Sequence, residues 1–321
     1  MRSKQSFCPS FRQFFDFARY NFDMNGKTRK REFEREAGPL EGRMPSSDDL
    51  TLAFDVEGQE DRPTVFLMHG GGQTRHSWSG AARALVDRGY RVVNYDARGH
   101  GDSDWSSRGA YSLADRVDDL RAMLSLSSPR FALVGASLGG ATALLATATG
   151  ILPAGLVLVD IVPEPEPEGI ERITRFMSAN PNGFGSLEEA VEAVAAYNPT
   201  RPRSGASAGL MRNLRRRSDG RLYWHWDPRI MELKPATHHA QVQGAAREVG
   251  RRAAVPIMLV RGLASDVVSD AGVVKFKALV PGLEVSDVRQ AGHMVAGDNN
   301  DTFVSAIMNF LERCLPLESG S

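Results

Sequence analysis

The pattern Gly-x-Ser-x-Gly, which can present a nucleophilic serine, occurs twice in the 321-residue chain. The copy centred on Ser137 follows the apolar run 131–134 and opens the helical stretch 138–149. A sharp turn from strand to helix lifts a serine hydroxyl above the sheet, and the flanking glycines prevent clashes in that turn. The copy centred on Ser207 follows a stretch rich in proline and arginine, with no strand before it. We therefore predict that Ser137 is the nucleophile and that the second copy is a loop.

A run of three glycines, HGGG at 69–72, directly follows the apolar run 64–68. Glycines let the backbone come close to a ligand, so that its N–H groups can point at a developing negative charge. The N–H groups at the start of a helix can do the same. We predict an oxyanion hole formed by the N–H groups of Gly71 and Leu138, with Gly72 as the alternative donor.

A triad on a sheet of this type runs along the chain in the order serine, acid, histidine. His293 lies in the segment 291–294, directly after the last expected strand, and is the predicted general base. Two acids follow strands; strand order favours Asp266, and Asp160 stays open as the alternative. The acid would hold the histidine tautomer and stabilise the imidazolium. The pair at 238–239 is interpreted as a helix-capping or surface feature.

The scaffold for these residues is predicted from the alternation of short apolar runs with segments of helical periodicity that begins at residue 50. Such alternation is typical of an open, mostly parallel sheet with helices on both faces. Strands are expected over 50–57, 64–68, 91–95, 131–134, 156–159, 257–260 and 283–288, and helices over 78–88, 113–124, 138–149 and 303–313.

The alternation stops between residues 163 and 235. The sequence PEPEPE at 163–168 argues against regular structure there, and helix-like stretches follow at 170–178, 187–197 and 210–217. We predict a helical cap over 163–235, inserted after the sixth strand, that forms a lid over the site. Candidates to line an apolar pocket are its aromatic side chains: Phe176, Phe184, Tyr197, Tyr223, Trp224 and Trp226. The predicted substrate contacts are Gly72, Trp224, Trp226 and Met294.

The composition is that of an ordinary globular chain, with 42% hydrophobic and 24% charged residues and a formal net charge of zero. A protein that mainly binds nucleic acid needs a basic surplus, so the charge argues against that class. No apolar run reaches the ~20 residues of a membrane span. Cys8 and Cys314 lie at opposite ends of the chain and can form neither a zinc cluster nor a disulfide framework. A reducing, cytoplasmic location is therefore expected.

The first 45 residues differ from the rest, because they hold 10 of the 39 basic residues, 6 of the 39 acidic residues and 7 of the 15 phenylalanines. Charges interrupt the aromatic stretch 11–22, which argues against a secretory signal, and the acids argue against a mitochondrial one. We expect residues 1–45 to be a disordered or loosely attached extension, or translated sequence upstream of a start at Met44. A helical arm stays open as a third interpretation.

Five segments together resemble the α/β-hydrolase superfamily over about residues 50–315: HGGG at 69–72, YDARGHGDSD at 95–104, GASLGG at 135–140, RGLASD at 261–266 and AGHM at 291–294. The resemblance implies an α/β-hydrolase fold, with a mostly parallel central sheet flanked by helices. Its core would consist of residues 46–162 and 236–321, on either side of the cap. Asp96, Arg98 and His100 would then brace loops near the site.

The same resemblance implies an enzyme of the esterase, lactonase or cofactor-free haloperoxidase-like branch. It would cleave a carboxylic ester or lactone of a small, fairly apolar substrate through an acyl-enzyme on Ser137, with no cofactor and no metal. C–C bond hydrolysis or perhydrolysis by the same triad stays open, as does a non-catalytic ligand receptor. Epoxide hydrolases and haloalkane dehalogenases of this fold carry Asp in place of the serine, which excludes both. The oligomeric state stays open, a homodimer included.

Overall fold

The computed structural model describes residues 20–22, 28–30, 39–198, 209–232 and 235–317. The chain divides into two compact units, Met1–Pro39 and Leu40–Ser321. In the first unit, strands β1 (Tyr20–Phe22) and β2 (Thr28–Lys30) pair antiparallel. The expected disordered or loosely attached extension falls largely on residues outside the described ranges.

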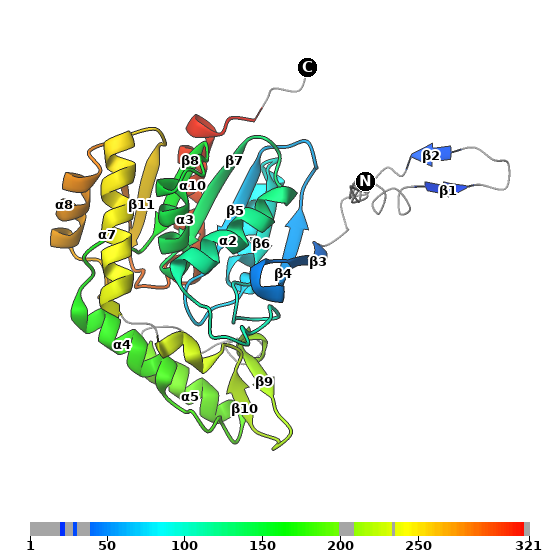
Figure 1. The fold of residues 1–321 in the computed structure, drawn as a ribbon, viewed down its shortest axis with the longest axis vertical. Coiled ribbons are helices and arrows are strands. Elements are labelled where there is room, and N and C mark those ends of the chain that lie inside the picture. The colour runs from blue at the N-terminus through cyan, green and yellow to red at the C-terminus, as the bar shows by residue number, and fades with distance from the viewer. Residues whose placement is uncertain (1–19, 23–27, 31–38, 199–208, 233–234, 318–321) are drawn as a thin grey trace, which may run out of the picture. The chain divides into compact units, whose positions relative to one another are not determined.

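The second unit is built on an eight-stranded sheet with the strand order β12-β11-β8-β7-β5-β6-β4-β3 (Figure 1). The pairs β5–β6, β5–β7, β7–β8, β8–β11 and β11–β12 are parallel, whereas β4 runs antiparallel to both of its neighbours. The mostly parallel sheet predicted from the sequence is thus confirmed. The strands are β3 (Leu40–Pro45), β4 (Thr51–Glu57), β5 (Thr64–Met68), β6 (Arg91–Tyr95), β7 (Phe131–Ala136), β8 (Gly155–Val159), β11 (Ile257–Gly262) and β12 (Glu284–Val288).

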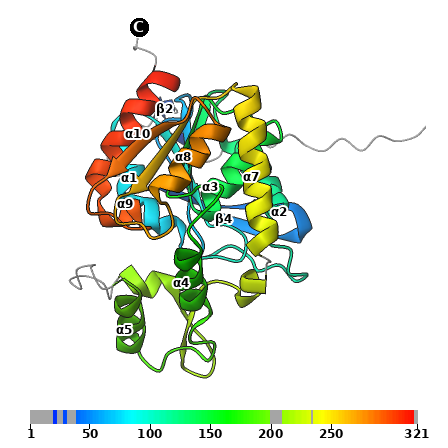
Figure 2. The same ribbon diagram turned by 90° about the vertical axis from the view of Figure 1, so that its left-hand side faces the viewer.

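Helices cover both faces of this sheet, because its central strands are apolar on both sides. Along β5, Val65 and Leu67 pack into one hydrophobic core, and Phe66 and Met68 pack into the other. Figure 2 shows α1 and α10 on one side of the molecule and α2 and α7 on the other. The helices of the sheet region are α1 (Ser79–Asp87), α2 (Leu113–Met123), α3 (Leu138–Ala148), α7 (Pro235–Arg252), α8 (Asp270–Leu279), α9 (Val295–Asp298) and α10 (Asn300–Cys314).

The sheet region begins with strand β3, at an earlier residue than we predicted from the sequence. Its residues pair antiparallel with β4, from Leu40 opposite Val56 to Pro45 opposite Thr51. The boundary expected after residue 45 is therefore too late, and the structure places it after Pro39. The pattern misled because β3 is an edge strand with alternating half-buried and exposed residues, which leaves no apolar run to recognise.

An inserted segment, residues 163–232, connects β8 to α7. It contains α4 (Pro167–Ser178), α5 (Leu187–Tyr197), the strands β9 (Leu214–Arg216) and β10 (Leu222–Trp224), and the 3₁₀ helix η7 (Pro228–Glu232). Figure 1 shows α4, α5, β9 and β10 grouped below the sheet, beyond the carboxyl ends of the parallel strands. Helix α4 begins within the PEPEPE sequence, with Pro167 at its first position, where a missing N–H does no harm.

One expectation about the inserted segment is wrong: residues 214–216, expected to be helical, form the first strand of a hairpin. Leu214 lies opposite Trp224 in that hairpin, and both are buried in a small hydrophobic core with Phe184. Burial of these side chains outweighs the local helical pattern. Among the helices that the structure describes, none is both long enough and apolar enough to cross a membrane.

Candidate active site

Ser137 stands at the turn between β7 and α3 in a backbone conformation that few residues other than glycine adopt. Its φ is 44° and its ψ is −108°. Glycines are required on each side: a Cβ on Gly139 would lie 2.2 Å from the carbonyl oxygen of Met68, and one on Gly135 would lie 2.5 Å from the backbone of Gly139. The turn therefore holds the serine in a strained conformation of the kind that clusters at active sites.

His293 and Asp160 form a hydrogen-bonded pair beside this turn. The Nδ1 atom of His293 lies 2.7 Å from Oδ2 of Asp160, whose side chain is fully buried. The carboxylate also accepts hydrogen bonds from the Ser265 hydroxyl at 2.6 Å and from the Gly262 N–H at 3.1 Å. Because Asp160 accepts at Nδ1, the other ring nitrogen of His293 is left to take a proton.

The pairing partner of His293 differs from the acid preferred in the sequence. Asp266 lies against the inserted segment, with its Oδ2 atom 2.8 Å from Nε of Arg172. Asp160, the alternative, occupies the position at the histidine. The sheet order explains this correction, because β8, which Asp160 follows, is the direct neighbour of β7 and Ser137. Order along the chain does not give that adjacency.

The hydrogen bonds made by the loop at 70–72 distinguish the two candidate oxyanion donors in it, Gly71 and Gly72. The Gly70 N–H donates to Oε1 of Gln73 at 3.0 Å, and the Gly72 N–H donates to Nε2 of His100 at 3.1 Å. For Gly71, no hydrogen bond of its N–H is found within the described part of the chain. The amide of Gly72 is therefore engaged, and Gly71 is the donor in this loop that a ligand can use.

Three buried histidines, His69, His100 and His225, hold this loop in place; we call them the histidine cluster. In each, one ring nitrogen accepts a backbone N–H, from Ala97 for His69, from Gly72 for His100 and from Gly101 for His225. The other nitrogen of each ring faces a backbone carbonyl, of Gly70, Arg98 and Gly72 respectively. All three rings are thus neutral.

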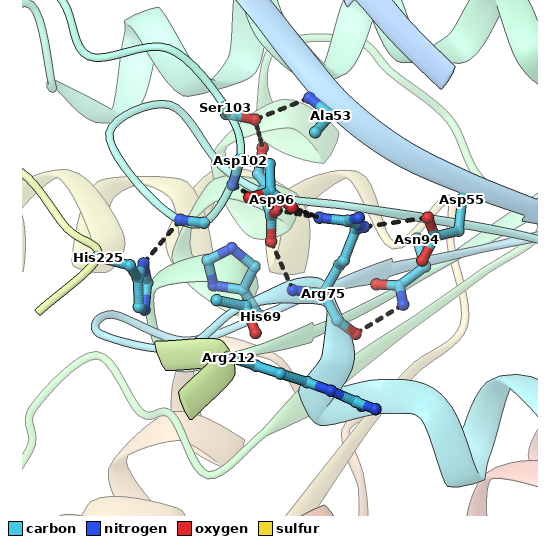
Figure 3. A network of polar contacts seen from close by, with 12 residues as sticks. Ala53, Asp55, His69, Arg75, Asn94, Asp96, Asp102, Ser103, Arg212 and His225 are labelled. Atoms are coloured by element: carbon cyan, nitrogen blue, oxygen red, sulfur yellow. Dashed lines mark hydrogen bonds and ion pairs between the residues drawn. The ribbon is translucent and has the colours of Figure 1, made fainter. Parts of the chain in front are cut away.

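Burial lowers the pKa of every member of the histidine cluster. The pKa of His69 is lowered by burial, that of His100 lies well below its ordinary value through burial and the neighbouring His69, and burial lowers the pKa of His225 to about 3. His225 comes from the inserted segment, and it accepts the Gly101 N–H at 2.7 Å (Figure 3). The cluster therefore joins the glycine loop, the 97–101 turn and the inserted segment.

Asp96 organises a second buried network next to the histidine cluster. Its carboxylate accepts hydrogen bonds from the N–H of Arg75 at 2.7 Å and from the N–H of Asp102 at 2.9 Å, and it pairs with the Arg75 guanidinium (Figure 3). Arg98 forms a two-pronged pair with Asp119, at 2.6 and 2.7 Å. These contacts match the bracing positions expected of Asp96, Arg98 and His100.

A cavity of about 650 Å³ lies between the sheet region and the inserted segment. All predicted catalytic and oxyanion residues except Asp266 line it. Four of the six candidate aromatic side chains also line it, whereas Phe184 is buried in the core of the inserted segment and Tyr223 stacks against Arg217. The predicted residues that line the cavity are Gly71, Gly72, Ser137, Leu138, Asp160, Phe176, Tyr197, Trp224, Trp226, His293 and Met294.

Among the lining residues that were not predicted for the site are three histidines and one arginine: His76, His238, His239 and Arg212. His238 and His239 correct the expectation of a capping or surface feature, because α7 starts at Pro235 and places them along the cavity wall. A longer apolar periodicity through 235–252 is the signal that would have placed them on a helix packed against the sheet. Arg212 carries no such signal, because it lies among other arginines.

Comparisons with known proteins identify the family of this chain. The family model of the α/β-hydrolase fold matches residues 63–299. Esterase Rv0045c of Mycobacterium tuberculosis is 29% identical over 258 residues, which cover 78% of this chain and 83% of that protein. The 2-(acetamidomethylene)succinate hydrolase of Mesorhizobium japonicum is 28% identical over 271 residues, covering 81% and 92%.

A solved structure shows the same fold. An α/β hydrolase from Novosphingobium aromaticivorans superposes with a TM-score of 0.72 at 28% identity, over 86% of this chain and 99% of that one. The family match spans well over half of the sequence and includes the strained serine turn, the glycine loop and the histidine. The chain belongs to the α/β-hydrolase fold family and is an enzyme, a hydrolase.

Proposed function

We propose that this hydrolase cleaves a carboxylic ester or lactone of a small, fairly apolar substrate through an acyl-enzyme on Ser137. The single observation that carries the proposal is the His293–Asp160 hydrogen bond in the cavity wall that also contains Ser137. A histidine held at Nδ1 by a buried carboxylate presents Nε2 as a general base. The two named relatives support the reaction class, since one is called an esterase and the other a hydrolase.

In the proposed mechanism, His293 takes the proton of the Ser137 hydroxyl as its oxygen attacks the substrate carbonyl. The negative charge that forms on the carbonyl oxygen is stabilised by the N–H groups of Gly71 and Leu138. The imidazolium, stabilised by Asp160, then protonates the leaving alcohol as the carbon–oxygen bond breaks. Water, deprotonated by the same histidine, attacks the acyl-enzyme and releases the acid and the free serine.

The apolar part of the cavity wall supports an acyl or aromatic group of moderate size. Side chains of α4 contribute Ile170, Ile173 and Met177, and those of α5 contribute Val191 and Val194. Trp224 and Trp226, stacked with ring centroids 4.8 Å apart, add a flat aromatic surface. Such predominantly apolar lining with few polar groups is typical of small-molecule sites.

The test is labelling with a fluorophosphonate probe, together with hydrolysis of nitrophenyl esters of increasing chain length and of several lactones. We expect the probe to modify Ser137, and Ser137→Ala to lose both labelling and turnover. Ser207→Ala is the matched control, because it removes the serine of the second Gly-x-Ser-x-Gly pattern. Labelling that survives Ser137→Ala, or that disappears in Ser207→Ala, would overturn the assignment.

A further inference from the structure

The ionisable groups that line the cavity include more basic than acidic side chains. Asp160 is the one carboxylate among its described lining residues, and it is hydrogen-bonded to His293. Arg212 is the one permanently charged cation among them. Besides the Tyr197 phenol, the other ionisable side chains of the wall are histidines: His76, His238, His239 and His293. A ligand in this cavity therefore meets one cation and no uncommitted carboxylate.

The guanidinium of Arg212 has no counter-ion in the described part of the chain. Figure 3 shows its side chain extended away from Asp96 and Asp102. The neighbouring segment 199–208 contains no aspartate or glutamate, so it offers no counter-ion either. Arg215, three residues later, forms an ion pair with Asp102 at 2.6 Å. Arg212 thus differs from its neighbour in leaving its charge available to the cavity.

The backbone around Arg212 is held firmly against the site. It belongs to the 3₁₀ helix η6 (Met211–Asn213), and its carbonyl accepts a hydrogen bond from Nη1 of Arg215 at 3.1 Å. The carbonyl of Asn213 accepts the N–H of His225 at 3.1 Å. Through His225, whose ring contacts Gly72, η6 is tied to the loop that holds the oxyanion donor. These contacts fix the backbone from which the Arg212 side chain extends, relative to the loop beside Ser137.

We propose that Arg212 binds a carboxylate of the substrate, so that the preferred substrates are esters or lactones that carry a carboxylate away from the cleaved bond. The inference rests on the proposed function of Ser137 and extends it. A planar guanidinium matches one carboxylate in a two-pronged pair. A single cation suits one such group, whereas a polyanion would need several. The apolar wall would accept the chain between the carboxylate and the reacting carbonyl.

The kinetic test uses pairs of esters that differ only in the negative charge. The nitrophenyl half-ester of glutarate is compared with nitrophenyl valerate, which places the charge on the acyl side. The acetate ester of 4-hydroxybenzoate is compared with phenyl acetate, which places it on the alcohol side. For each pair the readout is the ratio of kcat/KM for the anionic ester to that for the neutral ester, with Ser137→Ala as the blank.

We expect that ratio to fall about tenfold in Arg212→Gln for at least one pair, through a higher KM for the anionic ester, because a charge-assisted pair is lost. Arg212→Lys should retain part of the preference, since it keeps the charge without the fork. Arg216→Gln is the matched control: it removes an exposed arginine that is absent from the cavity wall and donates to the Gly220 carbonyl. Its ratio should equal that of the wild type.

A binding measurement separates this proposal from the proposed reaction. Monoethyl glutarate and ethyl valerate are titrated into Ser137→Ala and into Ser137→Ala with Arg212→Gln, with tryptophan fluorescence as the signal. We expect the second change to weaken only the binding of monoethyl glutarate, by about tenfold. If the wild type cleaves no ester, the proposed reaction fails, and this titration still decides the role of Arg212. Equal ratios and equal binding in the presence and absence of Arg212 would overturn the inference.

Discussion

At the scale of single residues, the buried carboxylate of Asp160 determines how His293 is presented. Its two oxygens accept from the Gly262 N–H, the Ser265 hydroxyl and the histidine ring. The end of β11 and the loop after it, from which the acid was expected, therefore supply donors that orient the acid instead. A carboxylate held by several donors is fixed in position, which suits its proposed role of orienting the histidine.

Replacing each of the two candidate acids by asparagine tests this geometry. We expect Asp160→Asn to lower kcat for a nitrophenyl ester by about a thousandfold or more, because an amide no longer enforces the histidine tautomer. Asp266→Asn, the matched control, breaks a half-exposed pair with Arg172 and should change kcat by less than about threefold. A larger loss from the Asp266 substitution would show that the triad acid is misassigned.

At the scale of elements, two histidines from different parts of the chain contact the glycine loop at Gly72. The N–H of Gly72 donates to His100, and its carbonyl faces the ring of His225 from the inserted segment. The first contact requires a neutral His100 ring, because a protonated imidazole can no longer accept an N–H. His225 must be neutral for a different reason, since its Nδ1 accepts the N–H of Gly101. The loop that offers the Gly71 N–H is therefore sensitive to the protonation of two buried histidines.

This requirement predicts a loss of stability in acid. The pKa of His225 is about 3 in the folded chain because of burial, and about 6.5 when unfolded. Between these values the unfolded chain binds more protons, so the free energy of unfolding should fall as pH drops below about 6.5, by up to roughly 1.4 kcal/mol per pH unit for this group. Denaturant unfolding between pH 4 and 7 measures the slope.

The variant His225→Gln isolates this contribution. A glutamine carbonyl can accept the Gly101 N–H and its amide can donate to Gly72, but it does not titrate. We expect its unfolding free energy to depend less steeply on pH over the same range than that of the wild type. Parallel curves for the two proteins would contradict the assignment of His225 as a neutral buried ring.

The serine turn depends on close approach between α3 and β5. A Cβ on Gly139 would lie 2.2 Å from the Met68 carbonyl oxygen, and backbone atoms cannot yield there as a flexible side chain can. We expect Gly139→Ala to lower the free energy of unfolding by about 2 kcal/mol or more and to abolish ester turnover. Gly244→Ala in α7 is the matched control, because no atom lies within 4 Å of its added Cβ. It should be neutral or stabilise by up to about 1 kcal/mol.

At the scale of the whole molecule, the cavity that contains the proposed active site is formed by two parts of the chain that meet at the carboxyl ends of the strands. The sheet region supplies Ser137, Asp160 and His293, and the inserted segment supplies most of the apolar wall. Arg172 of α4 bridges the two parts, since it pairs with Asp266 and lies over the ring of Tyr197 at 5.2 Å. Substrate selection can thus vary through the inserted segment without altering the triad.

The edge strand β3 determines how many residues can be removed from the start of the second unit without loss of stability. A chain that starts at Leu40 retains the whole β3–β4 ladder, and we expect its Tm and kcat to match those of the full chain. A chain that starts at Met44 loses four of the six paired residues and the contacts of Arg43 with Asp102 and Asp104. Its Tm should be lower by several degrees, as ~1 kcal/mol shifts Tm by ~2–4 °C in a chain of this size. Equal melting curves would show that β3 is dispensable.

Much of the fold could be predicted from local patterns. Strands β5 and β6 start and end at the expected residues, because buried parallel strands appear as continuous apolar runs between polar turns. The serine turn was recognisable because the close approach of backbone atoms on both sides of Ser137 requires glycine at 135 and 139, which leaves a short motif in the sequence. By contrast, β3 and the β9–β10 hairpin depend on pairing between weakly patterned neighbouring segments, and the apolar periodicity of one segment does not report such pairing.

The amino-acid sequence by itself determined most of the elements of the sheet region, their order, and the residue types at the serine turn, the glycine loop and His293, since these show in apolar periodicity and in short motifs. Only the tertiary structure decided which acid meets His293, which glycine amide stays free, and which side chains line the cavity. Each of these depends on the lateral order of the strands or on the docking of the inserted segment. Such adjacency arises from long-range packing, and the residue pattern of a short segment does not indicate it.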